Sequence, residues 1–285
     1  MTLRSSDRFA RRSNLSWTKC CSAIARLRVF VPGLPQRKHG RAFRLAQRPH
    51  DTVGRSLSFR VLFLASPYLG MEFFPGRFIV FCGPNGAGKS TLLRLFADTL
   101  RAAGDKVLET REPGGSPFGE AIRPHMKNPD LPRDKFSEAL LFASLRGMHL
   151  HQVVEPAVAA GKTVLCDRYV PSTLVYQVLL GGLPESAQEM IRAVNSQFRV
   201  PDITVFVLPG AADLAKRRSN RSGDRDAMQA DVEEELQAYR QVANSYPGAV
   251  VLEPSSTDMP FDTLESLALA LAPMLAGLAP VDVAA

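Results

Sequence analysis

The stretch Phe78-Ile79-Val80-Phe81-Cys82 runs directly into Gly83-Pro84-Asn85-Gly86-Ala87-Gly88-Lys89-Ser90-Thr91. The second part fits G-x-x-x-x-G-K-[ST], the P-loop pattern. The five apolar residues before it predict a buried strand, and an apolar period after it predicts a helix. That period consists of Leu92, Leu93, Leu95, Phe96 and Leu100. Because strand, loop and helix follow in the order that the pattern requires, residues 83–91 are predicted to bind a nucleoside triphosphate.

The composition of this loop assigns roles to two of its side chains. Its glycines permit a tight turn whose backbone N–H groups point at phosphate oxygens, and the positive end of the helix dipole faces the same anion. Lys89 supplies a mobile positive charge for the β- and γ-phosphates, and the Ser90 hydroxyl can bind Mg²⁺. ATP and Mg²⁺ are therefore expected, but many functions share a P-loop, so the loop alone leaves the reaction open.

The amino-acid sequence of the loop resembles the P-loop of ABC transporter ATPases. That family needs a second signature, L-S-G-G-Q, and none follows Thr91. It also needs an apolar strand ending in Asp-Glu, whereas the candidate strand at 163–166 ends in Asp167-Arg168-Tyr169. An ABC-like ATPase or nucleotide-binding component is therefore kept only as an alternative.

Strands and helices are predicted to alternate after Met71. The predicted strands are 77–82, 106–109, 163–167, 202–208 and 249–252. The predicted helices lie near 88–103, 117–127, 135–160, 171–180, 185–197, 211–218, 229–243 and 261–276. This alternation indicates an α/β fold, a five-stranded parallel sheet with helices on both faces and ligands at the carboxyl ends of the strands.

Charge divides the chain of 285 residues into two unlike parts. Residues 1–70 have 14 basic and two acidic side chains, whereas residues 71–285 have 21 basic and 26 acidic ones. The first part is predicted to be a poorly ordered extension. Three interpretations remain open: a transit peptide, a basic arm that binds nucleic acid or an anionic surface, or an upstream start assigned in error before Met71. We expect 71–285 to be the working P-loop domain.

No secretory signal or membrane span is evident in the sequence. The Ala/Leu-rich stretch 266–281 is interrupted by proline and glycine and is shorter than the ~20 apolar residues that a span needs. The four cysteines, Cys20, Cys21, Cys82 and Cys166, lack metal-ligand spacing, so buried reduced thiols are expected at the two strand ends. We expect a cytoplasmic enzyme with no membrane partner, and with nucleic acid as a partner only through residues 1–70.

A second motif follows the second predicted strand: Thr110-Arg111-Glu112-Pro113-Gly114-Gly115-Ser116. It resembles T-R-E-P-G-G-[TS] of bacterial-type thymidylate kinases. Three further stretches are similar to that family in the same order: 136–146, 164–177 and 199–204. The resemblance implies a P-loop kinase fold, transfer of the γ-phosphoryl group of Mg·ATP to dTMP, and a homodimer packed through the long helices. A kinase of the same fold that acts on another nucleoside monophosphate is the nearest alternative.

The first half of the predicted dTMP site lies on the loop after the second strand and on the two helices that follow. Glu112 and Pro113 belong to a strong turn where backbone can approach a ligand. Arg123 lies on the next helix, near the expected acceptor phosphate. Phe142 and Arg146 are four residues apart and share a helix face; in the family this pair stacks on the thymine and bonds its edge.

The second half of the predicted site starts at a charged pair, Asp167-Arg168, at the end of a buried strand. The resemblance assigns Arg168 to the dTMP phosphate, and Asp167 either orients this arginine or belongs to the Mg²⁺ shell. The following helix is expected to line the sugar and base with Ser172, Thr173, Tyr176 and Gln177. Tyr176 is a candidate for excluding a ribose 2′-hydroxyl, with core packing as an equal alternative.

A basic segment, Lys216 to Arg225, matches the position of the kinase lid, expected near 216–229. Phosphoryl transfer needs cations around the migrating group, and Lys89 is the sole charged residue of the P-loop. One subclass of the family supplies lid arginines instead. We therefore expect Arg217, Arg221 and Arg225 to be catalytic, together with Lys89 and Arg168.

Four positions depart from the family pattern. Cys82 replaces a glutamate, Asn85 an acidic residue, Pro209 an aspartate, and Ala227 the last residue of the lid motif D-R-x-E. These changes leave the phosphate-binding residues in place. They bear on Mg²⁺ handling, on the sugar contacts and on the choice of monophosphate.

Overall fold

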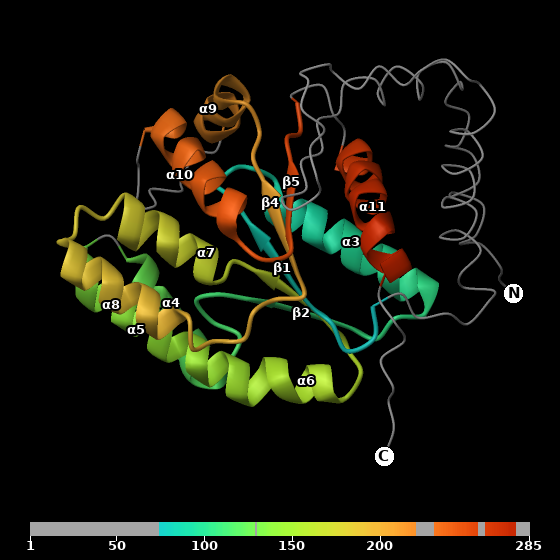
Figure 1. Ribbon diagram of the computed structural model, residues 1–285, viewed down its shortest axis with the longest axis horizontal. Helices are drawn as coiled ribbons and strands as arrows, with labels where there is room; N and C mark the ends of the chain where they lie inside the picture. The colour runs from blue at the N-terminus through green and yellow to red at the C-terminus, as the bar shows by residue number, and fades with distance from the viewer. Residues whose placement is uncertain (1–73, 129, 221–230, 256–259, 278–285) are drawn as a thin grey trace, which may run out of the picture.

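Five parallel strands form one sheet at the centre of the molecule (Figure 1). The computed structural model describes residues 74–128, 130–220, 231–255 and 260–277. The strands are β1 (Phe78–Cys82), β2 (Val107–Arg111), β3 (Thr163–Asp167), β4 (Ile203–Val207) and β5 (Ala249–Leu252). Their order across the sheet is β2-β3-β1-β4-β5, so the P-loop follows the central strand. The predicted five-stranded parallel sheet is confirmed.

Strand β1 explains why both faces of the sheet need helices. All five of its residues are buried. Phe78, Val80 and Cys82 belong to the core on one face, and Ile79 and Phe81 to the core on the other. Alternate side chains of a strand point to opposite faces, so an unbroken apolar run has to be covered on both.

Two helices cover one face: α3 (Lys89–Ala103) and α11 (Pro260–Gly277). Figure 1 shows them side by side on one side of the sheet. The other helical elements are α4 (Pro117–Lys127), α5 (Lys135–His149), η2 (Leu150–Val154), α6 (Glu155–Ala159), α7 (Val170–Thr173), η3 (Leu174–Leu179), α8 (Glu185–Asn195), α9 (Ala211–Ser219) and α10 (Val232–Ser245). The opposite face packs on η2, α6, α7, η3 and α10. Helices on both faces were predicted, and the arrangement confirms this.

Local sequence places the ends of the helices that face the site. Ser116 caps α4 by accepting a hydrogen bond from the N–H of Gly119 at 3.1 Å. Asp134 caps α5 by accepting from the N–H of Ser137 at 2.8 Å, and these bonds hold the pKa of its carboxyl below the usual range. Such caps satisfy N–H groups that the helix itself leaves without partners.

The observed elements differ from the predicted ones in two details. Strand β2 continues through Thr110 and Arg111, which were expected after the strand, because they pair with Cys166 and Asp167 of β3. The helices expected at 135–160 and 171–180 each contain a π-helical segment, η2 and η3. Such segments are often found at functional sites. No helix within the described residues is long and apolar enough to cross a membrane.

Candidate active site

The P-loop joins β1 to α3 and has its expected shape. Gly83 has a φ of 141°, and a Cβ atom there would lie 2.3 Å from the carbonyl oxygen of Val207 in β4. Gly88 is the N-cap of α3 with a φ of 101°, and no side chain caps the helix. The first N–H groups of α3 are therefore free of side-chain caps and can bind an anion.

Lys89 is buried, with 6% of its surface exposed. Its ammonium group donates a hydrogen bond to the carbonyl oxygen of Pro84 at 2.8 Å. Burial, and next the positive charge of Arg168, lower the pKa of Lys89 to about 7. The lysine is thus held inside the loop, where an arriving phosphate would supply the missing negative charge.

Ser90 and Asp167 meet at the edge of the P-loop. The Ser90 hydroxyl donates to Oδ2 of Asp167 at 2.5 Å. The other carboxylate oxygen, Oδ1, is buried and has no hydrogen-bond partner among the described residues. An unpartnered carboxylate oxygen beside a hydroxyl is a donor set that suits a hard cation such as Mg²⁺. Of the two roles expected for Asp167, this arrangement favours the metal shell.

A cavity of about 270 Å³ extends from the P-loop to α5. Most residues predicted from sequence line it: Asn85, Gly86, Gly88, Lys89, Ser90, Thr91, Glu112, Pro113, Arg123, Phe142, Arg146, Asp167, Arg168, Ser172, Thr173, Tyr176 and Gln177. Gly83, Pro84 and Ala87 belong to the loop without lining the cavity. The structure therefore joins the predicted ATP and acceptor residues in one space.

Arg168 lies between the P-loop and Tyr176 of η3 on the wall of the cavity. Its Nη1 donates to Tyr239 Oη at 3.1 Å, and its Nη2 donates to the side-chain oxygen of Asn85. Its guanidinium carbon lies 5.6 Å from the centre of the Tyr176 ring. Its backbone has a φ of 75°, a region that residues other than glycine rarely adopt. This arginine is thus fixed by both halves of the site.

The far end of the cavity is built around Arg146, which is only 3% exposed. Its Nε donates to Glu112 Oε2 at 2.7 Å, and its Nη2 donates to Thr173 Oγ1 at 3.2 Å. Phe142, one helical turn earlier on α5, lines the same cavity. Glu112 was predicted as a dTMP ligand, and its carboxylate is engaged with protein side chains. An aromatic ring and an arginine at one end are suited to a planar heterocycle.

Arg123 and Gln177 lie along the sides of the cavity. Arg123, half-buried, donates to the carbonyl oxygen of Pro113. Gln177 donates to Glu138 Oε2 at 3.0 Å.

Tyr176 is 5% exposed; its hydroxyl donates to Glu235, and its ring meets that of Tyr239 edge to face at 5.8 Å. Tyr176 thus both packs in the core and borders the cavity.

Comparison with known proteins decides the family of a chain with this fold and this cavity. A sequence model described as thymidylate kinase matches residues 81–258. This chain belongs to the thymidylate kinase family. Curated thymidylate kinases from Exiguobacterium sibiricum and Rhodopseudomonas palustris are 40% and 42% identical over 185 residues each. These matches cover 63% and 62% of this chain and 83% and 80% of the relatives.

A solved thymidylate kinase has the same fold. The crystal structure of the enzyme from Ehrlichia chaffeensis aligns with a TM-score of 0.50 and 26% identity. The match covers 68% of this chain and 97% of the other. The resemblance inferred from the sequence motifs is confirmed.

Two departures from the thymidylate kinase pattern lie within the described residues near the P-loop. The first is Cys82, a free and buried cysteine, and burial raises the pKa of its thiol to about 12. Cys82 is therefore an inert thiol in its present surroundings. Asn85 accepts a hydrogen bond from Arg168, so the amide acts as an uncharged partner of this arginine.

Part of the segment predicted to be the lid, 216–229, is described. Arg217 lies on α9 and donates to the carbonyl oxygens of Ala87 at 3.0 Å and Ser255 at 3.3 Å. Three other residues of the predicted lid, Arg221, Arg225 and Ala227, lie outside the described residues. The predicted lid thus begins beside the P-loop, and its central part is not described.

The sequence analysis missed three residues that support the site. Arg218 donates to the carbonyl oxygen of Asn85 at 3.0 Å and to Glu235 Oε2 at 2.5 Å. Glu235, which is 1% exposed, also accepts from Tyr176, so through Arg218 it links the P-loop to a residue on the wall of the cavity. His149 contacts Glu112 and follows Arg146 by three residues, a spacing that places both on one helix face and could have revealed it.

Proposed function

We propose that this chain transfers the γ-phosphoryl group of ATP to the phosphate of dTMP, giving ADP and dTDP. An oxygen of the dTMP phosphate forms the new bond to the γ-phosphorus as the bond to the ADP oxygen breaks. The observation that supports this best is the single cavity that holds Lys89 at one end, Arg168 in the middle and Phe142 with Arg146 at the other. It has the order of groups that a donor phosphate, an acceptor phosphate and a base require.

The main task of the protein in this reaction is to position the donor and acceptor phosphates with positively charged groups. The N-terminus of α3 and Lys89 bind the donor phosphates. Arg168, held by Asn85 and Tyr239, fixes the acceptor phosphate in line with them. Positioning and electrostatic stabilisation are the main contributions that a protein makes to phosphoryl transfer.

Mg²⁺ is the metal that we propose for this site, with Ser90 and Asp167 as the residues that would hold it. Their oxygen atoms and the unpartnered Oδ1 of Asp167 suit that ion. When bound, Mg²⁺ would neutralise charge on the β- and γ-phosphates.

A substrate panel tests the proposed reaction. Release of ADP is measured by a coupled assay with dTMP, dUMP, dGMP and CMP as acceptors. We expect dTMP to give the highest kcat/KM and ATP hydrolysis without a monophosphate to be negligible. A preference for another monophosphate would favour the other kinase, and hydrolysis without acceptor would favour the ABC-like alternative.

The lid is proposed to supply catalytic cations, because Arg217 already contacts the P-loop backbone through Ala87. Changing Arg217, Arg221 and Arg225 one at a time to alanine should lower kcat by about 10³-fold or more for at least one of them. The KM for ATP should change little in that variant. If all three variants keep kcat and only bind ATP more weakly, the lid holds phosphate without assisting transfer. Arg101 to alanine, at an exposed ion pair with Glu109, is the matched control.

ATP binding should take up protons above pH 7. Because burial lowers the pKa of Lys89 to about 7, the lysine is mostly neutral at pH 8 in the free protein. The negative triphosphate raises that pKa again, so affinity for ATP should fall as pH rises through 7, by at most about tenfold per pH unit. Calorimetry in two buffers of different ionisation enthalpy measures the uptake. A Lys89→Met variant should lose it, and equal uptake in both proteins would contradict the assignment.

A homodimer is proposed to form through the outer face of α5. Leu140 and Met148 are 36% and 38% exposed on this face, and both line a depression together with Gly147, Phe198 and Val194 of α8. A Ser144→Arg change on the same face should convert a dimer to a monomer of 31.2 kDa in light scattering. An Arg101→Met control should remain dimeric, and a wild-type monomer at micromolar concentration would contradict the proposal.

The division of the chain stays a prediction. Residues 1–70 lie outside the described part, and the family match starts at residue 81. We propose that 71–285 is the working kinase domain. We also propose a cytoplasmic location, supported by the free buried thiols of Cys82 and Cys166.

A further inference from the structure

We propose that His149 is a positioning residue for the acceptor base, acting on Arg146 through Glu112. The inference rests on the proposed function, because it assumes that Arg146 contacts the base of a monophosphate. His149 is the last residue of α5 and has no exposed surface. It does not line the cavity and so does not itself touch the substrate.

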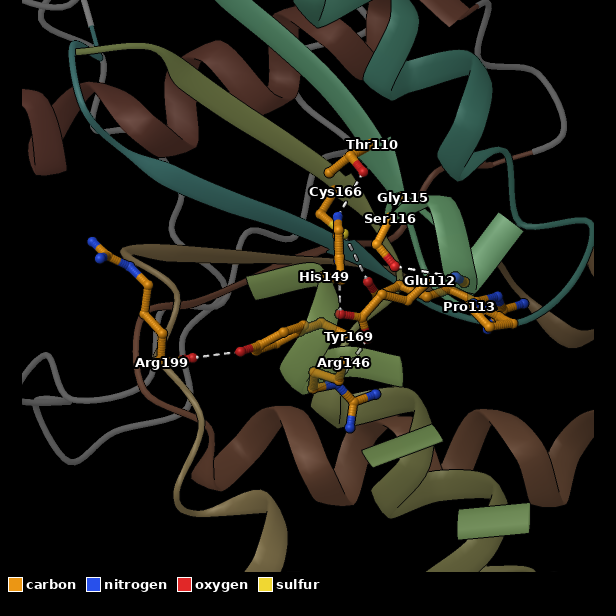
Figure 2. Close-up of polar contacts among 12 residues, drawn as sticks. Thr110, Glu112, Pro113, Gly115, Ser116, Arg146, His149, Cys166, Tyr169 and Arg199 are labelled. Carbon is orange, nitrogen blue, oxygen red and sulfur yellow. Dashed lines mark hydrogen bonds and ion pairs between the residues drawn. The ribbon is translucent and has the colours of Figure 1, made fainter. Parts of the chain in front are cut away.

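Figure 2 shows His149 between the two residues that it connects, Thr110 and Glu112. Its Nδ1 lies 3.1 Å from Glu112 Oε1, and its Nε2 lies 2.7 Å from Thr110 Oγ1. Thr110 is part of β2, and Glu112 is the first residue after that strand. The histidine therefore ties the end of α5 to the loop that forms one wall of the cavity.

The chemistry of the partners sets the direction of these bonds. Glu112 is ion-paired with Arg146, so its carboxylate can only accept. Nδ1 of His149 must therefore carry a hydrogen and donate it to Oε1. In the neutral ring Nε2 is then an acceptor, and the Thr110 hydroxyl donates to it.

Both oxygens of the Glu112 carboxylate are thus held, Oε1 by His149 and Oε2 by Arg146. Arg146 in turn donates to Asn195 and Thr173, and its guanidinium lies 5.1 Å from the centre of the Tyr169 ring. Three of its five N–H donors are used within the described residues, which leaves two for a ligand. A carboxylate that is free to rotate would no longer fix the direction of those two.

The backbone is shaped to admit the histidine ring. A Cβ atom on Gly115 would lie 2.3 Å from Nε2 of His149 and 2.6 Å from Oγ1 of Thr110. The φ of Gly115 is 78°, a conformation that favours glycine. The His149 ring therefore occupies the space that a side chain at Gly115, the second glycine of the T-R-E-P-G-G stretch, would need. This contact packs the loop against α5.

Two amide substitutions separate positioning from packing, because each replaces one ring nitrogen. In His149→Asn the amide nitrogen takes the place of Nδ1 and can still donate to Glu112. In His149→Gln the amide lies near the place of Nε2 and can reach only Thr110. Both remove a buried ring, so a packing role predicts similar effects.

We expect His149→Gln to raise the KM for dTMP by about tenfold or more, since it removes a hydrogen bond to a charged group. His149→Asn should stay within about threefold of wild type. The KM for ATP and kcat should stay within about threefold in both variants, because the P-loop is not part of this network. Steady-state kinetics with each substrate varied in turn supply these values.

Equal KM values for dTMP in the two variants would overturn the proposal, as would an equal rise in the KM for ATP. If neither variant folds, Thr110→Val removes the donor to Nε2 while keeping the ring. It should raise the KM for dTMP about threefold, and an unchanged value would overturn the proposal. Should the wild-type chain prefer another monophosphate, the comparison is made with that acceptor, so failure of the proposed function is distinguished from failure of this inference.

Discussion

Changing Lys89 to alanine is expected to lower kcat by about 10³-fold or more while the fold stays intact. Lys89 is the only charged side chain of residues 83–91, and it is held inside the loop by the carbonyl oxygen of Pro84. Removing a single cation from the transferring phosphoryl group costs this much in related reactions. Steady-state kinetics at saturating ATP and dTMP measure the loss, and Lys89→Met, which keeps the volume, should show the same loss.

Measurements of thermal stability show whether the Lys89 variants remain folded and serve as the control for this prediction. The pKa of Lys89 is lowered by burial to about 7, so between pH 7 and about 10 the unfolded chain binds more protons than the folded one. The free energy of unfolding of the wild type should therefore increase as the pH rises through this window. In Lys89→Met this increase should be absent. The Tm of the variant at pH 7 should be equal to or above that of the wild type. Near-normal turnover, or a collapse of Tm, would contradict the assignment.

Changing Arg168 to methionine is the second large effect that we expect, with kcat/KM for dTMP lowered by about 10³-fold. The change leaves the side chain of Asn85 and the hydroxyl of Tyr239 without their charged partner. Hydrogen bonds to a charged group contribute about 1.5–3 kcal/mol each, so the variant loses these bonds as well as the charge that would bind the acceptor phosphate. Arg168→Lys should lose less, because it keeps the charge and loses only the fork of donors.

The assay for Arg168 compares kcat/KM for dTMP with the Kd for ATP. Arg101→Met removes an exposed arginine at the far end of α3 and should leave both values unchanged. If Arg168→Met weakens ATP binding and leaves the acceptor constants unchanged, the residue belongs to the donor site.

The fold could be predicted from the sequence because its signals are local. Five short strand patterns that alternate with helical periods predict a parallel sheet covered on both faces. The order of the strands and the end of β2 could not be predicted in this way. Thr110 and Arg111 are polar, and they are strand residues only because β3 offers Cys166 and Asp167 as partners.

The candidate site could be predicted where motifs name its residues, as for Lys89 and Arg146. It could not be predicted where a role arises from a contact between distant segments. Glu235 meets Tyr176, 59 residues away in the chain, and only the packing of α10 against η3 joins them. Arg218 belongs to a basic run that is typical of a solvated surface. Its ion pair with the buried Glu235, which the sequence does not reveal, places it beside the site.

Gly83 shows why the first position of the loop resists redesign. A side chain there would strike the backbone of β4, which contains no phosphate ligand. In a mutational library screened for turnover, replacements at Gly83 would lower activity. Because Gly83 belongs to the P-loop, that loss would be attributed to weaker nucleotide binding. The cause would instead be a new side chain that pushes the neighbouring strands β1 and β4 apart. An engineer who wishes to adapt the loop to a different phosphate donor therefore has to start after this residue.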